Sequence, residues 1–231
     1  MRLYKGYFIG ILSLLPALSF CNNYGLLEKL ESSGASAKNI SYTQNNFIFV
    51  SSWLVDGTIN PSPYVECAGQ TGIARADCAC TKTAEFNGKL RYPGHKYYAW
   101  LSMSGSDAIC RMQGLANGCN TSGAGTAAPW FNTMGNTVVN NLSVFTTGAL
   151  SNPVLFDETG GTPGTQFVWT GTSTTGISGG TDCGTWLSTG STGSIGDRTS
   201  SGTLWTQASP SPNAHPTCNT TQRIYCIAAP N

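Results

Sequence analysis

The nine cysteines are the residues of this sequence with the widest range of possible chemistry. A thiol can form a disulfide, carry a lipid or bind zinc or copper. Cys78 and Cys80 form a C-x-C in "RADCAC", a spacing that suits a metal as well as disulfides. In an oxidising compartment we expect disulfides instead. Because nine is odd, at least one cysteine must stay outside any full set of intrachain disulfides.

Catalytic chemistry needs a nucleophile, a base and a group that orients the base. The two histidines, His95 in "PGHKY" and His215 in "NAHP", stand in no recognisable catalytic motif, and we interpret both as loop histidines. Asp157 and Glu158 are adjacent, whereas glycosidase carboxylates lie roughly 5–10 Å apart across a cleft. A turn or surface role suits this acidic pair better. The sequence therefore predicts no enzyme, no cofactor and no metal site.

The densest basic stretch contains Lys82, Lys89, Arg91 and Lys96. One interpretation is a solvated helix end and loop. The other is a ligand-binding patch for a glycosaminoglycan or for an acidic surface of a partner. The net charge of the whole chain is only +1, and without Arg2 and Lys5 it is −1, with 10 basic against 11 acidic residues. Such a balance gives no long-range attraction to nucleic acid, which we exclude as a partner.

The N-terminus has the features of a secretory signal peptide. Arg2 and Lys5 precede an apolar stretch, residues 7–20, which is too short to span a bilayer as a helix. The stretch ends in "LSFC", which resembles a bacterial lipobox, although Phe20 stands where a small residue is usual. We therefore predict a signal peptide over residues 1–20 and lipid attachment at Cys21. Eight cysteines then remain, an even set that suggests disulfides.

The rest of the chain is predicted to form a polar tether followed by one α+β domain. Residues 21–44 comprise the lipidated N-terminus and the flexible tether, and residues 45–231 the domain. Ile73, Ala76, Cys80 and Ala84 recur at helical intervals and predict a helix over residues 72–86. Apolar runs rich in strand formers predict strands, and "NNLSVFTTG" predicts a short helical turn. The predicted strands cover residues 47–50, 96–103, 166–172 and 223–229, and the turn covers residues 140–148.

Six fragments occur in order over residues 46–228: "GIARADCAC", "YYAWLS", "FDETG", "VWTGT", "DCGTW" and "CNTTQRIYC". Together they resemble the endostatin module of collagen, and more closely the leptospiral endostatin-like family of surface lipoproteins. The resemblance implies a disulfide-stabilised, C-type-lectin-like α+β fold, in which a twisted antiparallel sheet has flanking helices and the first and last strands lie side by side.

The same resemblance implies two disulfides, Cys80–Cys226 and Cys183–Cys218. The other four cysteines are outside the family pattern, and their proximity in sequence suggests Cys67–Cys78 and Cys110–Cys119. The zinc-binding histidines of endostatin and the calcium-binding triplets of sugar-binding lectins have no counterparts in this sequence.

The function that the resemblance implies is adhesion. Members of the family are lipid-anchored in the outer membrane, exposed at the cell surface, and associated with host extracellular matrix proteins such as laminin and fibronectin. Some members also bind plasminogen or complement factor H. The alternative is a structural envelope lipoprotein with no host ligand. In either case the membrane is contacted through the lipid anchor.

Overall fold

The computed structural model describes residues 46–87, 90, 95–120, 129–208 and 215–230. All of them belong to one compact unit. The predicted signal peptide, Cys21 and the predicted tether lie outside the described residues. The helices are α1 (Gly72–Phe86), α2 (Ala108–Arg111) and α3 (Cys183–Trp186), with 3-10 helices η3 (Val65–Cys67), η4 (Leu142–Thr146) and η5 (Thr203–Trp205). The strands are β1 (Asn46–Val50), β2 (Tyr97–Ala99), β3 (Trp130–Phe131), β4 (Thr137–Val139), β5 (Phe167–Trp169), β6 (Ile195–Asp197) and β7 (Arg223–Ala228).

The sheet is centred on β7, in the strand order β4-β3-β1-β7-β5-β6 with β2 also paired to β7. β7 is antiparallel to β1 and β2 but parallel to β5, and β1 is parallel to β3. The expectation of an antiparallel sheet is therefore wrong in part, because the sheet is mixed. Parallel neighbours need a long crossover, and the chain between β1 and β3 supplies one that carries α1, β2 and α2.

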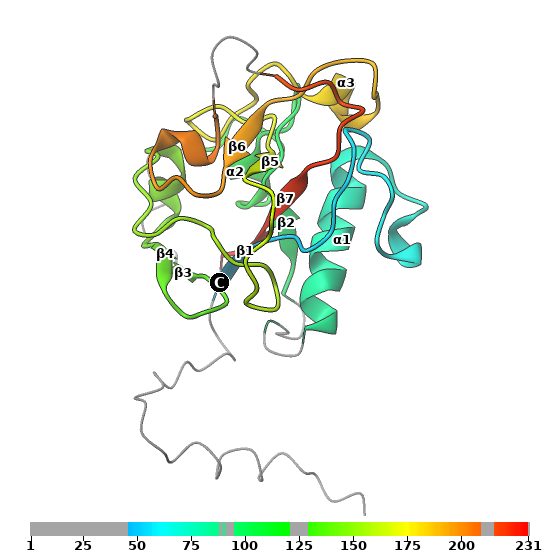
Figure 1. Cartoon of the computed structure of the whole chain (residues 1–231). Coiled ribbons are helices and arrows are strands. Elements are labelled where there is room, and N and C mark those ends of the chain that lie inside the picture. Colours follow the sequence, from blue (N-terminus) through cyan, green and yellow to red (C-terminus); the bar gives the residue numbers. More distant parts are fainter. Residues whose placement is uncertain (1–45, 88–89, 91–94, 121–128, 209–214, 231) are drawn as a thin grey trace, which may run out of the picture. The chain divides into compact units, whose positions relative to one another are not determined.

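Helix α1 has the bounds that the sequence periodicity predicts, and its buried face includes Ile73, Ala76, Cys80 and Ala84. It lies alongside β2 and β7 (Figure 1). The Cys80–Cys226 disulfide joins the middle of this helix to the central strand. α1 is thus attached to the sheet by both apolar packing and a covalent bond.

The core is rich in aromatic rings that come from distant parts of the chain. Trp100, Phe145, Trp205 and Tyr225 are all at most 1% exposed. Their ring centroids are 5.1–5.8 Å apart in successive pairs. Every residue of β1 is buried as well. The abundant tryptophan of the sequence therefore fills the interior, where each ring removes a large apolar area from water.

Four disulfides cross-link the domain, and they join the same pairs that we expected. The bonds are Cys67–Cys78, Cys80–Cys226, Cys110–Cys119 and Cys183–Cys218, with Cα–Cα distances between 5.2 and 5.7 Å. All eight cysteines of the described residues are paired in this way. Cys21 lies outside the described residues.

The predicted strand over residues 47–50 is present as β1, which begins one residue earlier, and the other predicted elements are present but shorter than their sequence patterns. The predicted strand over residues 96–103 is reduced to β2, because the chain changes hydrogen-bond partners after Trp100. Trp100 N still donates to Tyr225 O at 3.0 Å, whereas Ser102 N donates to Thr170 O at 2.9 Å, beyond the end of β5. The predicted strand over residues 166–172 is likewise reduced to β5, and the predicted turn over residues 140–148 contains η4.

Candidate ligand-binding surface

A hollow of about 450 Å³ lies between one flank of α1 and the start of β2, and we call it the lysine hollow. Its walls hold two lysines of the predicted basic patch, Lys82 and Lys96, together with two tyrosines and small polar residues. The lining residues are Gln70, Ala74, Asp77, Cys78, Thr81, Lys82, Lys96, Tyr97 and Tyr98. The structure thus brings together two positions that are fourteen residues apart in sequence.

The two lysines differ in whether a neighbouring carboxylate neutralises their charge. Lys82 Nζ lies 2.7 Å from Glu85 Oε2, one turn further along α1, and this hydrogen bond raises the pKa of Lys82. Lys96 is exposed, and among the described residues no carboxylate lies within 4.0 Å of its Nζ. Lys89 and Arg91 lie outside the described residues, so their part in the patch stays a prediction. Lys96 is the main positive charge at the rim of the hollow.

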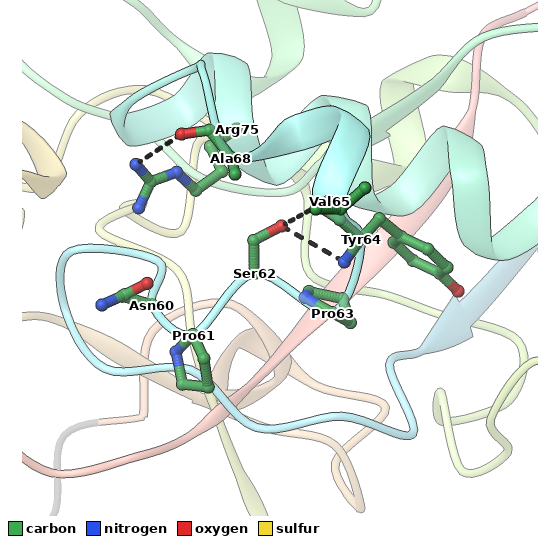
Figure 2. Close-up of a pocket in the computed structure, with 8 residues that line it drawn as sticks. All are labelled: Asn60, Pro61, Ser62, Pro63, Tyr64, Val65, Ala68 and Arg75. Carbon is green, nitrogen blue, oxygen red and sulfur yellow. Dashed lines mark hydrogen bonds between the residues drawn. The ribbon is translucent and has the colours of Figure 1, made fainter.

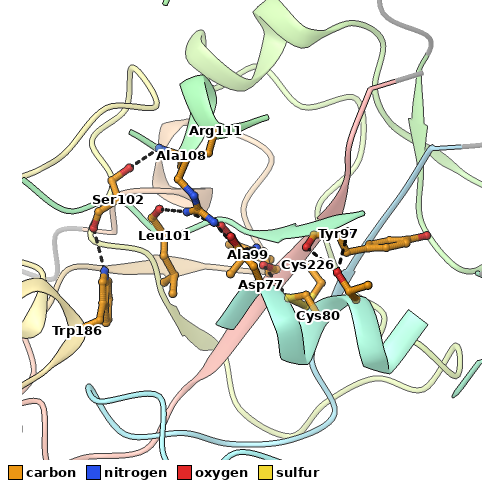
Figure 3. A network of polar contacts seen from close by, with 12 residues as sticks. Asp77, Cys80, Tyr97, Ala99, Leu101, Ser102, Ala108, Arg111, Trp186 and Cys226 are labelled. Atoms are coloured by element: carbon orange, nitrogen blue, oxygen red, sulfur yellow. Dashed lines mark hydrogen bonds and ion pairs between the residues drawn. A yellow bond between two sulfur atoms is a disulfide. The ribbon is translucent and has the colours of Figure 1, made fainter. Parts of the chain in front are cut away.

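Asp77, which lines the lysine hollow, forms an ion pair with the buried Arg111 behind it (Figure 3). Arg111, 9% exposed, pairs with Asp77 and lies 5.6 Å from the centre of the Tyr98 ring. Arg111 Nη1 also donates to Ala99 O at 3.3 Å and Leu101 O at 2.8 Å. Burial raises the pKa of Asp77, and Arg111 opposes that shift. Because Arg111 compensates Asp77, this ion pair adds little net charge to the hollow.

A second surface lies on the other flank of α1, and we call it the Tyr64–Phe86 surface after its residues Tyr64, Val65 and Phe86. The rings of Tyr64 and Phe86 stack at 5.4 Å with an interplanar angle of 13°. Val65 is 85% exposed and Phe86 is 70% exposed. They are the two most exposed large apolar side chains of the described residues, and exposed apolar side chains that lie together can mark a binding surface.

Tyr64 separates two shallow hollows. The first, about 390 Å³, is lined by Asn60, Pro61, Ser62, Pro63, Tyr64, Val65, Ala68 and Arg75 (Figure 2). Within it Ser62 Oγ donates to Tyr64 O at 2.9 Å, and Arg75 Nε donates to Gln70 O at 2.6 Å. The first bond shapes the loop that carries Tyr64 and Val65. The second bond and the Cys67–Cys78 disulfide attach that loop to α1.

The second hollow, about 350 Å³, is lined by Tyr64, Thr83, Phe86, Asn87, Glu158 and Thr159. Glu158 is 9% exposed, and its carboxylate accepts hydrogen bonds from the backbone N–H and the hydroxyl of Ser52. Asp157 Oδ1 accepts from Thr159 N at 2.9 Å and Gly161 N at 2.8 Å, which closes a turn. Asp157 therefore has the turn role that we expected, whereas Glu158 is buried rather than at the surface, and the two carboxylates serve different bonds.

The two histidines bond to different parts of the fold. His95 Nε2 lies 3.0 Å from Ala229 O, beyond the end of β7. His215 Nδ1 lies 3.4 Å from Thr181 Oγ1, before α3. Within the described ranges no group of three or more His, Cys, Asp or Glu residues is placed to hold a metal ion.

Sequence reasoning missed the Tyr64–Phe86 surface. One signal was present, because Phe86 lies roughly 120° around the helix axis from the centre of the apolar stripe formed by Ile73, Ala76, Cys80 and Ala84. A large aromatic residue outside the predicted buried stripe indicates either a second contact or an exposed ring. Tyr64 and Val65 gave no such signal, since "PSPYVEC" has no periodicity.

Comparisons with known proteins leave the chain without a family assignment. No protein-family model matches the sequence, and no curated protein matches it significantly. In the part of the chain that the structure describes, every helix is too short or too polar to cross a bilayer. What the chain does must therefore be inferred from its own residues, its cross-links and these two surfaces.

Proposed function

We propose that the chain is a non-enzymatic, lipid-anchored binding protein of a bacterial surface, a member of the endostatin-like lipoproteins with a C-type-lectin-like fold. Three structural features support this assignment. The first and last strands of the domain, β1 and β7, are neighbours. Cys80 joins Cys226, and Cys183 joins Cys218, the two pairs that the family resemblance implies.

The pairing of the cysteines carries the proposal. Eight cysteines form four disulfides within the domain, which indicates folding in an oxidising compartment and therefore export. The ninth, Cys21, follows an apolar segment of signal-peptide type. Because the other eight cysteines pair with one another, Cys21 is left over, and lipid attachment explains its presence. Each buried CH₂ of an attached chain contributes about 0.8 kcal/mol, so two or three chains hold the protein firmly in a bilayer.

The lysine hollow is the proposed ligand site for host matrix proteins such as laminin and fibronectin, or for plasminogen or factor H. Lys96 and Lys82 offer ammonium groups to an acidic segment of a partner, and Tyr98 supplies an aromatic wall. Charges at a rim contribute little each, about 0–1 kcal/mol, and salt screens them. We therefore expect weak, salt-dependent contacts at this site, with association rates that fall as salt increases.

The test is binding of the oxidised chain, residues 22–231, to immobilised laminin, fibronectin, plasminogen and factor H across a salt series. The variant Lys82→Ala/Lys96→Ala should lose at least about threefold in affinity for a true ligand, which corresponds to roughly 0.7 kcal/mol. A matched control, Lys29→Ala/Lys38→Ala, removes the same charge from the predicted tether and should bind like the parent. Equal losses in both variants would overturn the assignment of the hollow.

Two further outcomes separate the proposal from its alternative. Saturable binding that disappears after reduction of the disulfides would support the adhesin. A protein that binds nothing on this panel at micromolar concentrations, and that resists protease added to intact cells, would be the structural envelope lipoprotein. Mass spectrometry of the native protein tests the anchor directly, because lipid on Cys21 adds a defined mass that the variant Cys21→Ser lacks.

A further inference from the structure

We propose that the Tyr64–Phe86 surface rests on the bilayer that holds the lipid anchor, so that the domain has a second, non-covalent membrane contact. This inference deepens the proposed function and rests on its anchored chain. The surface lies on a different face of α1 from the lysine hollow. The proposal identifies the lipid bilayer as the partner that covers its exposed apolar side chains.

The degree of exposure is the first observation. Val65 and Phe86 are the two most exposed large apolar side chains of the described residues, at 85% and 70%. They are adjacent through Tyr64, which stacks on Phe86. Exposed apolar side chains that gather at one place indicate a binding partner with an apolar face. Tyrosine suits the boundary of a bilayer, because its ring is apolar and its hydroxyl is polar.

The position of this surface is the second observation. β1 begins at Asn46, and its antiparallel register with β7, Ile48 opposite Ile227, places that first residue near the end of β7. Tyr97, the first residue of β2, pairs with Ala228 at the same end of the sheet. Thr81 in α1 bonds to Tyr97, so the C-terminal turn of α1 lies at this end too (Figure 1). The end of the domain that the anchored chain enters is the end that carries Phe86.

Because the segment between Cys21 and the domain is short, even a weak affinity of the surface for lipid would keep it in contact with the bilayer for much of the time. Residues 22–45, which number 24, separate Cys21 from Asn46. A flexible tether of this length, as the sequence predicts, has an end-to-end distance of about 27 Å. Such a tether holds the domain beside the bilayer at an effective concentration on the order of millimolar. A surface with only millimolar affinity for lipid would therefore be bound about half of the time.

The charges around the surface favour a bilayer over an acidic or basic protein. Lys82 and Glu85 compensate each other in an ion pair near the end of α1. The carboxylate of Glu158 is bonded to Ser52 and barely exposed. At its edge the exposed Glu66, next to Val65, and Arg75, in the first hollow, carry opposite charges. The surface thus combines apolar area with little net charge, which a zwitterionic lipid surface matches without electrostatic cost.

The experiment attaches residues 21–231 to vesicles through Cys21. Since the other eight cysteines are paired, Cys21 is the free thiol that reacts with a maleimide lipid in phosphatidylcholine vesicles. The vesicles contain lipids with brominated chains, which quench nearby tryptophan. The variant Phe86→Trp should lose about half of its added emission, as expected for a contact populated half of the time.

Leu187→Trp is the matched control. Leu187 is 58% exposed and lies against Gly72, at the N-terminal end of α1, so its tryptophan should keep its emission. Equal quenching of the two variants, or none at position 86, would overturn the proposal. The chemical coupling works whether or not the cell lipidates Cys21, so failure of this contact is distinct from failure of the anchor. Loss of laminin binding in Phe86→Ser, without quenching in Phe86→Trp, would assign the surface to a protein partner instead.

Discussion

At its N-terminal end α1 is held by backbone against backbone, whereas at its C-terminal end it presents side chains to solvent. A Cβ added to Gly72, the first residue of α1, would lie 3.2 Å from the carbonyl oxygen of Thr185. Phe86, the last residue of the helix, is 70% exposed, and its closest ring neighbour is the partly exposed Tyr64. One helix therefore joins a tightly constrained region to an accessible one.

The constrained region is the α3 turn, residues Cys183–Trp186. All four residues have positive φ, between 52° and 61°, a left-handed conformation that costs about 1–2 kcal/mol for each residue other than glycine. The surrounding structure compensates for this cost. Cys183 is tied to Cys218, Thr185 N donates to Asp182 Oδ1 at 2.9 Å, and Trp186 is fully buried with its Nε1 donating to Ser102 O at 3.0 Å.

The difference between the two ends shows at which positions the fold constrains the residue type and at which positions it does not. At the α3 turn the side chains of Cys183 and Trp186 are fully buried, so a change of either disturbs the packing around it. At Val65 and Phe86 a change disturbs little of the described structure, so other constraints, such as a lipid or protein partner, can determine those residues. Mutations should therefore separate stability from binding along a single helix.

The largest effect is expected at the constrained end. Trp186→Ala removes a fully buried indole and leaves a cavity, which should cost about 4 kcal/mol. Leu187→Ala, at the next residue, is the control, because that side chain is 58% exposed. A change at such a surface position should cost less than about 0.5 kcal/mol. Urea unfolding of the oxidised proteins measures both. A loss below about 2 kcal/mol for Trp186→Ala, which is less than a large buried side chain normally costs, would contradict the view that the turn is held by its packing.

Alkaline pH tests the core beneath the exposed end. Burial raises the pKa of Tyr97 and Tyr225 well above the ordinary value near 10. The pKa of each tyrosine is higher in the folded than in the unfolded protein. Ionisation of these tyrosines therefore leaves the free energy of unfolding unchanged below about pH 10 and lowers it as the pH rises further. Two such tyrosines should lower the free energy of unfolding by roughly 3 kcal/mol per pH unit in that range.

The measurement is urea unfolding at several alkaline pH values, with tyrosinate absorbance as a second readout. Tyr97→Phe removes one of the two groups and should reduce the slope with pH by about half. If the free energy of unfolding of Tyr97→Phe depended on pH as steeply as that of the parent, Tyr97 would ionise in the folded protein. Solvent would then reach the core beneath β2.

A smaller loss is expected for Gly72→Ala. Gly72 has a φ of 54°, where an alanine is strained, and the added Cβ would also crowd Thr185 O. We expect a loss of about 1–2 kcal/mol. Gly69→Ala is the matched control, because φ there is not positive and nothing lies within 4 Å of the added Cβ. Similar stabilities of the two variants in urea would mean that the α1–α3 contact can adjust.

The two ends of α1 also differ in how well the sequence predicts their structure. The apolar period of α1 and the strand-forming run of β7 are local signals, and both elements lie where those signals predict. The resemblance implied the Cys183–Cys218 bond but not the left-handed conformation of the α3 turn, because no local pattern records contacts such as the one from Trp186 to the carbonyl oxygen of Ser102. The mixed strand directions are equally non-local.

The candidate site was predictable only in part, for a similar reason. Lys82 and Lys96 were identified from their charge, and the fold brings them to one hollow because Thr81 bonds to Tyr97. The exposure of Val65 and Phe86, in contrast, depends on which side chains the rest of the domain covers. A sequence shows that a residue is apolar, but its solvent exposure follows from packing that no local pattern records.

The smallest effect on stability is expected at the accessible end. Val65 is 85% exposed, so Val65→Ser should change the free energy of unfolding by less than about 0.5 kcal/mol. Phe86→Ala removes the stack on Tyr64 and should cost slightly more, about 0.5–1 kcal/mol. If urea unfolding instead shows losses above about 1.5 kcal/mol, which surface substitutions rarely cause, these side chains stabilise the fold and their exposure needs no ligand. If both variants are as stable as expected, any loss of membrane contact or partner binding in them comes from the surface itself.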